Sequence, residues 1–327
     1  MIGGDPREAA KPPITLADIE SAAGRIRGRV LRSPLRRSDW LSVGAGVEVL
    51  LKLEVLQPTF SYKVRGAINA VERHVESGDV SALVTASAGN HGRALAFAAA
   101  ARLIPLTVYA PARAPRTKLD AIRSLGADLR LCGNYEEAER AAKQHAAHGA
   151  ARYISAYSHP DVIAGAGTIG SEILNDCPVV GTIVVPIGGG GLISGIATAV
   201  QGWSQKPVVC GVEAESSKPF TAGRAAGRIV EVPVAPTLAD GLAGNLDPDT
   251  ITFAIVQRLV PQIVTVSEEE IRLAMQGVVR HEHLIAEGAA AVGVAAVLQG
   301  RIRAIEKPVA IVLSGANVDI EVLRSLL

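Results

Sequence analysis

Residues 81–110 read SALVTASAGNHGRALAFAAAARLIPLTVYA, and this stretch decides the fold. A strand-length apolar run at 81–86 is followed by a helical run of small residues at 91–101 and a second strand-length run at 106–110. A strand, a helix and a strand at this spacing form a βαβ unit, in which the two strands run parallel. The stretch therefore predicts an α/β fold built on parallel sheets covered by helices.

The same alternation continues on both sides of this unit. Further strands are expected at 48–53, 128–132, 152–155, 182–187, 207–212, 262–266 and 308–313. Further helices are expected near 115–125, 135–148, 162–175, 192–201, 268–281 and 287–299. Thr15 with Asp18, and Ser267 with Glu270, have the spacing of capping boxes at helix starts. Residues 215–250 are rich in Gly, Pro, Ser and Asp, which predicts a surface loop.

The composition is that of a globular protein of one large or two smaller domains. Hydrophobic residues make up 48% of the 327 residues and aromatic residues only 3%, so Ala, Val, Leu and Ile must fill the core. The net charge of +1, without long runs of one sign, gives no indication of nucleic-acid binding. The three isolated cysteines predict neither a disulfide framework nor a metal site. Without a signal-like or membrane-spanning apolar run, the expected location is the cytoplasm, with no membrane partner.

Ligands of open parallel sheets bind beyond the carboxyl ends of the strands, so we looked for reactive residues there. Lys63 lies in the segment Ser61-Tyr-Lys-Val-Arg-Gly-Ala67, in semi-apolar surroundings where a helix begins. Partial desolvation and the positive end of the helix dipole both lower a lysine pKa, which makes the amine a nucleophile toward an aldehyde. Taken alone, the segment is also compatible with a surface lysine at a helix start.

Two glycine-containing loops follow predicted strands. In Ser87-Ala-Gly-Asn-His-Gly92 the small residues let backbone amides approach an anion at a helix N-terminus. The four glycines of 188–191, followed by Leu192, have the character of a backbone nest for a phosphate. Taken alone, the first loop is equally compatible with an ordinary turn capped by Asn90.

A dinucleotide-binding protein is the alternative from a different class. The glycine run fits neither a P-loop, because Ile196 stands at the lysine position, nor G-x-G-x-x-G, because Ser194 stands at the third glycine. Glu213, about twenty residues further on at a strand end, nevertheless keeps this alternative open. A fourth segment, Ser314-Gly-Ala-Asn317, follows the last strand and is compatible with either a ligand contact or a simple turn.

The combination of SYKVRGA, SAGNHG, GGGGL and SGANVD, in this order, resembles the fold-type II pyridoxal-5′-phosphate (PLP) enzymes. Within them it is similar to the serine/threonine dehydratase and serine racemase family. The resemblance implies a two-domain α/β fold like that of the tryptophan synthase β chain. It implies a larger PLP-binding domain at 1–80 and 155–327 and a smaller mobile domain at 81–154 that carries the substrate-carboxylate loop. A homodimer is also expected.

The resemblance assigns roles to individual residues. Lys63 would form the Schiff base with the cofactor and act as the catalytic base. The cofactor contacts would come from Phe60, Asn90, Gly188, Gly189, Gly190, Gly191, Leu192, Glu287 and Ser314. The substrate contacts would come from Ser61, Ser87, Ala88, Gly89, Asn90 and His91. The implied activity is removal of water from a 3-hydroxy amino acid such as L-threonine or L-serine, which yields a 2-oxo acid and ammonia.

Departures from the family pattern leave the substrate open. Resembling racemases carry a serine where Ala88 stands, and alanine cannot relay a proton, which favours a dehydratase over a racemase. Phe60 stands where many relatives have glycine. The metal motif of racemase-like relatives begins at a position matching Glu213, but Pro219 replaces its later carboxylate, so no metal is predicted. The segments 85–94 and 286–296 resemble the branch assigned to hydroxyectoine utilisation, and an ectoine-derived, aryl-substituted or carboxyl-substituted serine stays an alternative substrate.

Overall fold

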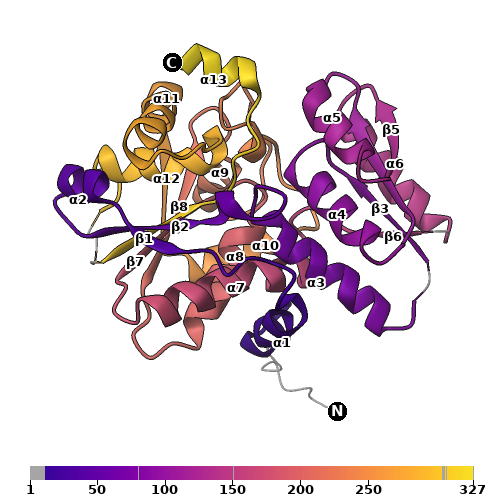
Figure 1. The fold of residues 1–327 in the computed structure, drawn as a ribbon, viewed down its shortest axis with the longest axis horizontal. Coiled ribbons are helices and arrows are strands. Elements are labelled where there is room, and N and C mark those ends of the chain that lie inside the picture. The colour runs from indigo at the N-terminus through magenta and orange to yellow at the C-terminus, as the bar shows by residue number, and fades with distance from the viewer. Residues whose placement is uncertain (1–11, 80, 150, 304–305, 307, 327) are drawn as a thin grey trace, which may run out of the picture.

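The computed structural model describes residues 12–79, 81–149, 151–303, 306 and 308–326 (Figure 1). The strands are β1 (Leu35–Arg37), β2 (Val49–Leu53), β3 (Ala82–Ala86), β4 (Leu106–Pro111), β5 (Asp128–Cys132), β6 (Ala151–Tyr153), β7 (Thr182–Pro186), β8 (Val208–Ala214), β9 (Gln262–Val266) and β10 (Val309–Leu313). The helices are α1 (Leu16–Ile26), α2 (Asp39–Ala45), α3 (Lys63–Glu76), α4 (Asn90–Ala100), α5 (Arg116–Arg123), α6 (Tyr135–Ala147), α7 (Pro160–Asp176), α8 (Gly191–Gln201), α9 (Pro219–Ala226), α10 (Thr252–Leu259), α11 (Glu268–Gly277), α12 (Gly288–Leu298) and α13 (Ile320–Leu326). Short 3-10 turns lie at Glu54–Leu56 and Asp240–Leu242, and a π-helical turn lies at Val278–Glu282.

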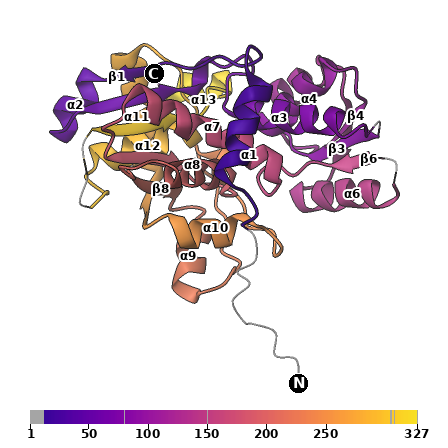
Figure 2. The same ribbon diagram turned by 90° about the horizontal axis from the view of Figure 1, so that it is seen from below.

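The βαβ stretch supplies the two central strands, β3 and β4, of a four-stranded parallel sheet in the order β5-β4-β3-β6. Successive residues of β3 point to opposite faces, so Leu83 packs with Leu95 of α4 while Val84 packs with Ala138 of α6. Figure 2 shows α4 and α6 on opposite sides of this sheet. With both faces covered, the strand is apolar at four of its five positions, and the buried Thr85 hydroxyl donates to the Ile154 carbonyl at 2.7 Å. The predicted α/β fold is confirmed.

The remaining strands form a second sheet in the order β1-β2-β10-β7-β8-β9. Its last strand in the chain, β10, lies between β2 and β7 and is parallel to both. Ile311 faces the core under α12, whereas Ala310 and Val312 face the core under α7 and α8. Among the described residues no helix is both long and apolar enough to cross a bilayer.

Sequence analysis missed several elements. β1 pairs antiparallel with β2, with Leu35 opposite Lys52, so the sheet is not wholly parallel. β1 has only three residues, and two of them are exposed arginines, which gives no apolar alternation to detect. The short helices α2, α10 and α13 were not predicted either. Both predicted capping boxes, at Thr15 and Ser267, are present.

The prediction of a surface loop at 215–250 was wrong in part. This region contains α9 and a 3-10 turn, and Phe220 is buried in the core. The buried carboxylate of Glu213 accepts hydrogen bonds from the backbone N–H groups of Phe220 at 2.8 Å and Thr221 at 2.9 Å. A carboxylate at this helix end satisfies unpaired amides. The capping residue, Glu213, belongs to the strand β8 and does not directly precede α9. The sequence at the start of α9 therefore carries no N-cap signal.

A buried ionic cluster ties α3 to the larger sheet. The Arg65 guanidinium is fully buried and contacts Glu54 at 2.8 Å and Glu172 of α7 at 2.7 Å. Lys52 of β2, also fully buried, contacts Glu172 at 2.6 Å. Burial raises the pKa of Glu54, but the charge and hydrogen bonds of Arg65 more than offset this and hold its pKa below the usual value. The cluster therefore stays charged and joins three elements at one point.

Replacing Arg65 with Met should leave the buried Glu54 carboxylate without its main cation. We expect Arg65→Met to lower the free energy of unfolding by about 3–5 kcal/mol in urea denaturation. Arg324→Met, which removes an exposed pair with Glu321, is the matched control and should cost about 0–1 kcal/mol. Equal losses in both variants would contradict the importance of the buried cluster.

Candidate active site

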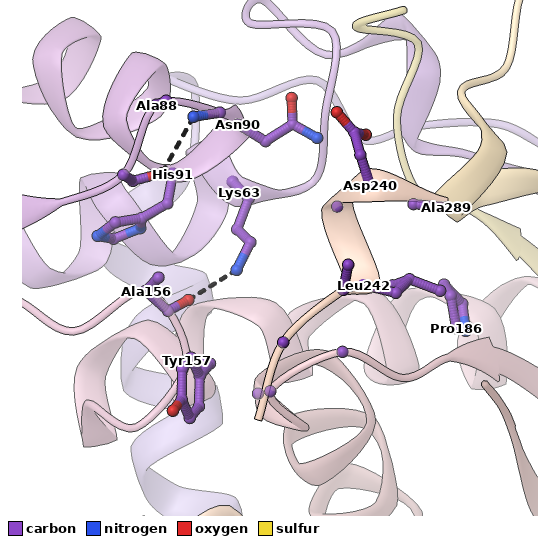
Figure 3. A pocket seen from close by; sticks show the side chains of 18 of the residues that line it. Lys63, Ala88, Asn90, His91, Ala156, Tyr157, Pro186, Asp240, Leu242 and Ala289 are labelled. Carbon is purple, nitrogen blue, oxygen red and sulfur yellow. Dashed lines mark hydrogen bonds between the residues drawn. The ribbon is translucent and has the colours of Figure 1, made fainter. Parts of the chain in front are cut away.

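A cavity of about 330 Å³ opens where the carboxyl ends of strands from both sheets converge. Its walls come from the segments after β3, β4, β6, β7 and β10, from the start of α3, and from the turn at Asp240–Leu242. Figure 3 shows the Lys63 side chain extending into this space, with Asn90 and His91 on one side and Leu242 on the other. The cavity thus collects the segments that sequence analysis singled out.

Lys63 is the first residue of α3, and its amine lies inside the cavity. Nζ donates a hydrogen bond to the Ala156 carbonyl at 2.6 Å (Figure 3). The helix start is held in place because Tyr62 N–H donates to the Ser314 carbonyl at 2.9 Å. Burial lowers the pKa of Lys63 to about 8, although the nearby Glu287 carboxylate acts in the opposite direction. A much larger fraction of this amine than of an ordinary exposed lysine is therefore uncharged near neutral pH and nucleophilic.

A second lysine, Lys118 of α5, lines the same cavity. It forms an ion pair with Asp240, which joins the four-stranded side of the molecule to the turn on the other side. Lys63 has no such ion pair in the described part of the chain. Of the two amines, Lys63 is therefore the one suited to react.

The loop before α4 presents backbone and small side chains to the cavity. Gly89 N–H donates to the Ser87 hydroxyl at 3.2 Å. A Cβ at Gly92 would lie 2.3 Å from the Ser87 carbonyl oxygen, so only glycine lets the helix turn so close to the loop. Ala88 and Asn90 also line the cavity.

His91 is buried at the edge of the cavity and stays neutral. Burial and the charge of Lys63 lower its pKa to about 3. Nε2 lies 3.3 Å from the Ile154 carbonyl, which can only accept, so Nε2 carries the hydrogen. Nδ1 is then an acceptor, and it has no hydrogen-bond partner among the residues that the structure describes.

Glu287 is a buried carboxyl group at the start of α12. Its Oε1 accepts a hydrogen bond from Asn90 Nδ2 at 2.7 Å, and Asn90 Oδ1 accepts one from Asn317 Nδ2 at 2.6 Å. Burial, helped by the charge of Asp240, raises the pKa of Glu287 to about 7. The group therefore changes its charge close to neutral pH beside Lys63.

The glycine loop forms a tight cradle at the N-terminus of α8. A Cβ at Gly189 would lie 2.2 Å from the Tyr157 ring, and one at Gly190 would lie 2.6 Å from Phe220. Gly190 also has a φ of +85°, which side chains disfavour. Backbone amides packed this closely at a helix start suit a phosphate group.

Two predicted contacts do not line the cavity. Phe60 has a φ of 57° and is 49% exposed, with the Arg93 guanidinium 5.1 Å from its ring centre. The contact of Phe60 with the cofactor therefore stays a prediction. Ser61 is buried and pairs with Gly315 in a short bridge, and its hydroxyl has no hydrogen-bond partner within the described part of the chain.

Several lining residues were missed as site residues. Ala156, Tyr135 and Lys118 carry no motif, and only the tertiary fold brings them to the cavity. Asp240 lies in the 3-10 turn at Asp240–Leu242 and was not assigned a role either. Asn317 belongs to the fourth segment but was not assigned a role.

Comparison with known proteins agrees with this geometry. The model of the family described as pyridoxal-phosphate dependent enzyme matches residues 26–315. The chain belongs to the pyridoxal-phosphate-dependent enzymes. Its relatives include an L-threonine ammonia-lyase of Thermotoga maritima, 41% identical over 96% of this chain and 78% of that protein. A catabolic L-threonine dehydratase of Staphylococcus aureus is 36% identical over 94% of this chain and 90% of that protein. Maize serine racemase has a similar structure, with a TM-score of 0.90 and 30% identity over 96% of both chains.

The residues present fit this cofactor. Pyridoxal phosphate needs an amine for its aldehyde and a site for its phosphate, and Lys63 and the glycine cradle line one cavity. The dinucleotide alternative loses its support, because the Glu213 carboxylate caps α9 and does not line the cavity.

The charge of Glu287 should set the pH at which Lys63 reacts. Only the uncharged amine attacks an aldehyde, so covalent attachment of added cofactor to the cofactor-free protein should speed up with pH and level off above about 8. Glu287→Gln removes a charge that raises the pKa of Lys63. In this variant the rate of cofactor attachment should level off at a lower pH than in the wild type. Stopped-flow absorbance measures this rate. Glu269→Gln, on the exposed start of α11, is the control, and an identical shift in both variants would contradict this account.

Proposed function

We propose that this enzyme removes water from a small 3-hydroxy amino acid such as L-threonine or L-serine and releases a 2-oxo acid and ammonia. The observation that carries the proposal is the buried Lys63 amine, which shares one cavity with the 87–91 loop and the glycine cradle. The names of the relatives, threonine ammonia-lyase and threonine dehydratase, support the same reaction class.

Each group in the cavity has a chemical task in this proposal. Bound pyridoxal phosphate supplies an electron sink that makes the Cα–H bond of an attached amino acid acidic. Lys63 Nζ, held toward Cα by the Ala156 carbonyl, takes up the Cα proton. The β-hydroxyl then leaves as water with a proton that the cofactor phosphate would supply, and hydrolysis of the released unsaturated amine takes up one water to give the 2-oxo acid and ammonia. The backbone of segment 87–90 orients the substrate carboxylate, and neutral His91 adds no competing positive charge.

The cofactor contacts are part of the proposal. Gly188, Gly189, Gly190, Gly191 and Leu192 would hold the phosphate through backbone amides. Asn90, oriented by Glu287 and Asn317, would donate to the ring oxygen of the cofactor, and Ser314 would face the ring nitrogen. Ser314 lines the cavity and is neutral, so it would not hold a full positive charge on that nitrogen. This favours elimination over transamination.

Racemisation is the second candidate activity, and maize serine racemase is structurally similar. A racemase needs a second proton donor on the opposite face of Cα. Ala88 lines the cavity and carries no such group. We therefore propose a dehydratase with little or no racemase activity, and a hydroxyectoine-derived or substituted serine stays an alternative substrate.

We further propose that 81–154 moves as a smaller domain against 12–79 and 155–326. The ion pair of Lys118 with Asp240 and the hydrogen bond of Thr117 with Asp319 cross between these parts at the cavity. Hydrogen bonds of Asn90 with Glu287 and Asn317 also cross this boundary, and the apolar packing of α4 on α3 joins the two parts away from the cavity. The remaining residues of the predicted domains lie outside the described residues.

The three free cysteines support a reducing location such as the cytoplasm, and a homodimer stays a prediction.

The test is a screen of 3-hydroxy amino acids for 2-oxo acid release by the cofactor-loaded enzyme. L-Threonine should give a 2-oxo acid and ammonia, and Lys63→Ala should lower kcat by about 10²–10⁴ or more, because it removes the base. Lys206→Ala, an exposed lysine outside the cavity, is the control and should keep full activity.

Chiral analysis of recovered serine separates the two candidate activities. The serine should remain in the L form while keto acid accumulates. Accumulation of D-serine at a rate comparable to keto acid would contradict the dehydratase proposal. Failure of every 3-hydroxy amino acid in the screen would overturn it.

A further inference from the structure

One peptide unit of the glycine cradle is held from outside the cavity. Gly189 and Gly190 line the cavity, whereas Thr252, the first residue of α10, is fully buried and does not line it. The Thr252 hydroxyl donates a hydrogen bond to the Gly189 carbonyl at 2.7 Å. The Gly189 carbonyl oxygen is therefore directed away from the cavity, toward α10.

The direction of this carbonyl also sets the direction of the next N–H group. A trans peptide unit is planar, and its C=O and N–H bonds point to opposite sides. With the Gly189 carbonyl turned toward Thr252, Gly190 N–H is turned toward the cavity. This N–H has no hydrogen-bond partner within the described chain, whereas the Gly190 carbonyl accepts from Ser194 N–H at 3.0 Å. Gly190 N–H is therefore available to a ligand.

The Thr252 hydroxyl is itself fixed by a second threonine. Thr250 Oγ1 lies 2.8 Å from Thr252 Oγ1 and accepts from Thr252 N–H at 3.3 Å. The single hydroxyl hydrogen of Thr252 goes to the Gly189 carbonyl, which can only accept, so Thr250 donates to Thr252. The two hydroxyls form a directed chain that ends on Gly189, and such chains strengthen each hydrogen bond in them.

The segment 247–252 also holds Gly189 through Tyr157. The Tyr157 ring packs against Gly189 so closely that a Cβ there would lie 2.2 Å from it. The Tyr157 hydroxyl accepts a hydrogen bond from Asp247 N–H at 3.0 Å, and the neighbouring Ser158 hydroxyl accepts one from Ile251 N–H at 3.1 Å. Gly189 is therefore fixed from two directions by one segment.

The charges of the cavity make this orientation important. Among the described residues, the only lysines or arginines that line the cavity are Lys63 and Lys118. Lys118 is paired with Asp240, and the Lys63 amine is needed for the cofactor aldehyde. A phosphate in the cradle would thus depend on neutral backbone donors, which stabilise an anion only when they point at it.

We propose that Thr252 is a positioning residue, which turns the Gly189–Gly190 peptide so that Gly190 N–H donates to the cofactor phosphate. This role rests on the proposed placement of that phosphate in the glycine cradle. Glycines leave a peptide unit free to rotate, and Gly190 has a φ of +85°. Thr252 removes this freedom before the cofactor binds, so binding loses less conformational entropy.

A comparison of pyridoxal phosphate with pyridoxal, which has no phosphate group, tests the proposal. Holoenzyme is dialysed to equilibrium against graded concentrations of either compound, and the fraction loaded is read from its absorbance. Thr252→Val keeps the shape of the side chain and removes the hydroxyl. It should lower the preference for pyridoxal phosphate over pyridoxal about tenfold, or 1.4 kcal/mol, with the affinity for pyridoxal unchanged.

Two further variants separate orientation from general damage to the fold. Thr252→Ser retains the hydroxyl and should keep the wild-type preference within about twofold. Thr198→Val is the matched control, because Thr198 is also buried and its hydroxyl donates to the Ser194 carbonyl at 2.8 Å, away from the cradle. It should leave the preference unchanged. Thermal melting followed by circular dichroism shows that each variant is folded.

The proposal is overturned if Thr252→Val keeps the wild-type preference, or if it weakens both compounds equally. A loss in Thr252→Ser as large as in Thr252→Val would also overturn it, because the hydroxyl would then not be the cause. A wild type without any preference for pyridoxal phosphate would remove the phosphate from the cradle and this role with it. The readout is cofactor binding, so the proposed dehydration is tested separately by 2-oxo acid release.

Discussion

This candidate active site depends on a buried amine. The amine must be uncharged often enough to react, and its direction must be fixed. Lys63 meets both requirements because its Nζ is withdrawn from water and bonded to the Ala156 carbonyl. Two residues further along the same helix, Arg65 is clamped by Glu54 and Glu172 in the core. Lys63 thus stands on a helix start that a buried ionic cluster anchors to both β2 and α7.

The surrounding site follows from the same topology. Parallel strands present their carboxyl ends at one edge, so loops distant in sequence meet around Lys63. The loop after β3 and the glycine cradle after β7 both use close packing that excludes side chains, as Gly92 and Gly189 show. Both surfaces offer backbone amides, which suits a substrate carboxylate on one side and a cofactor phosphate on the other.

Much of the fold and of the candidate site could be predicted from the sequence, because the signals for these parts are local. The strands β3 and β4 are apolar runs with one threonine each and β10 is an unbroken apolar run, and several helices begin or end at recognisable residues. Lys63, Asn90 and the four glycines stand in compact segments. What could not be predicted depends on contacts across the fold: Ala156 meets Lys63, Lys118 meets Asp240, and Glu213 caps α9 from a neighbouring strand. Phe60 shows the limit most clearly, because nothing in its residue type signals a backbone φ of 57°.

The most direct test of the central claim is to find which lysine carries the cofactor. The cofactor-loaded protein is reduced with borohydride, digested and analysed by mass spectrometry for the pyridoxyl mass. The account predicts the label on the peptide that contains Lys63, with Lys118 unmodified. A label on Lys118, the other lysine lining the cavity in the described part of the chain, or no label at all, would contradict it.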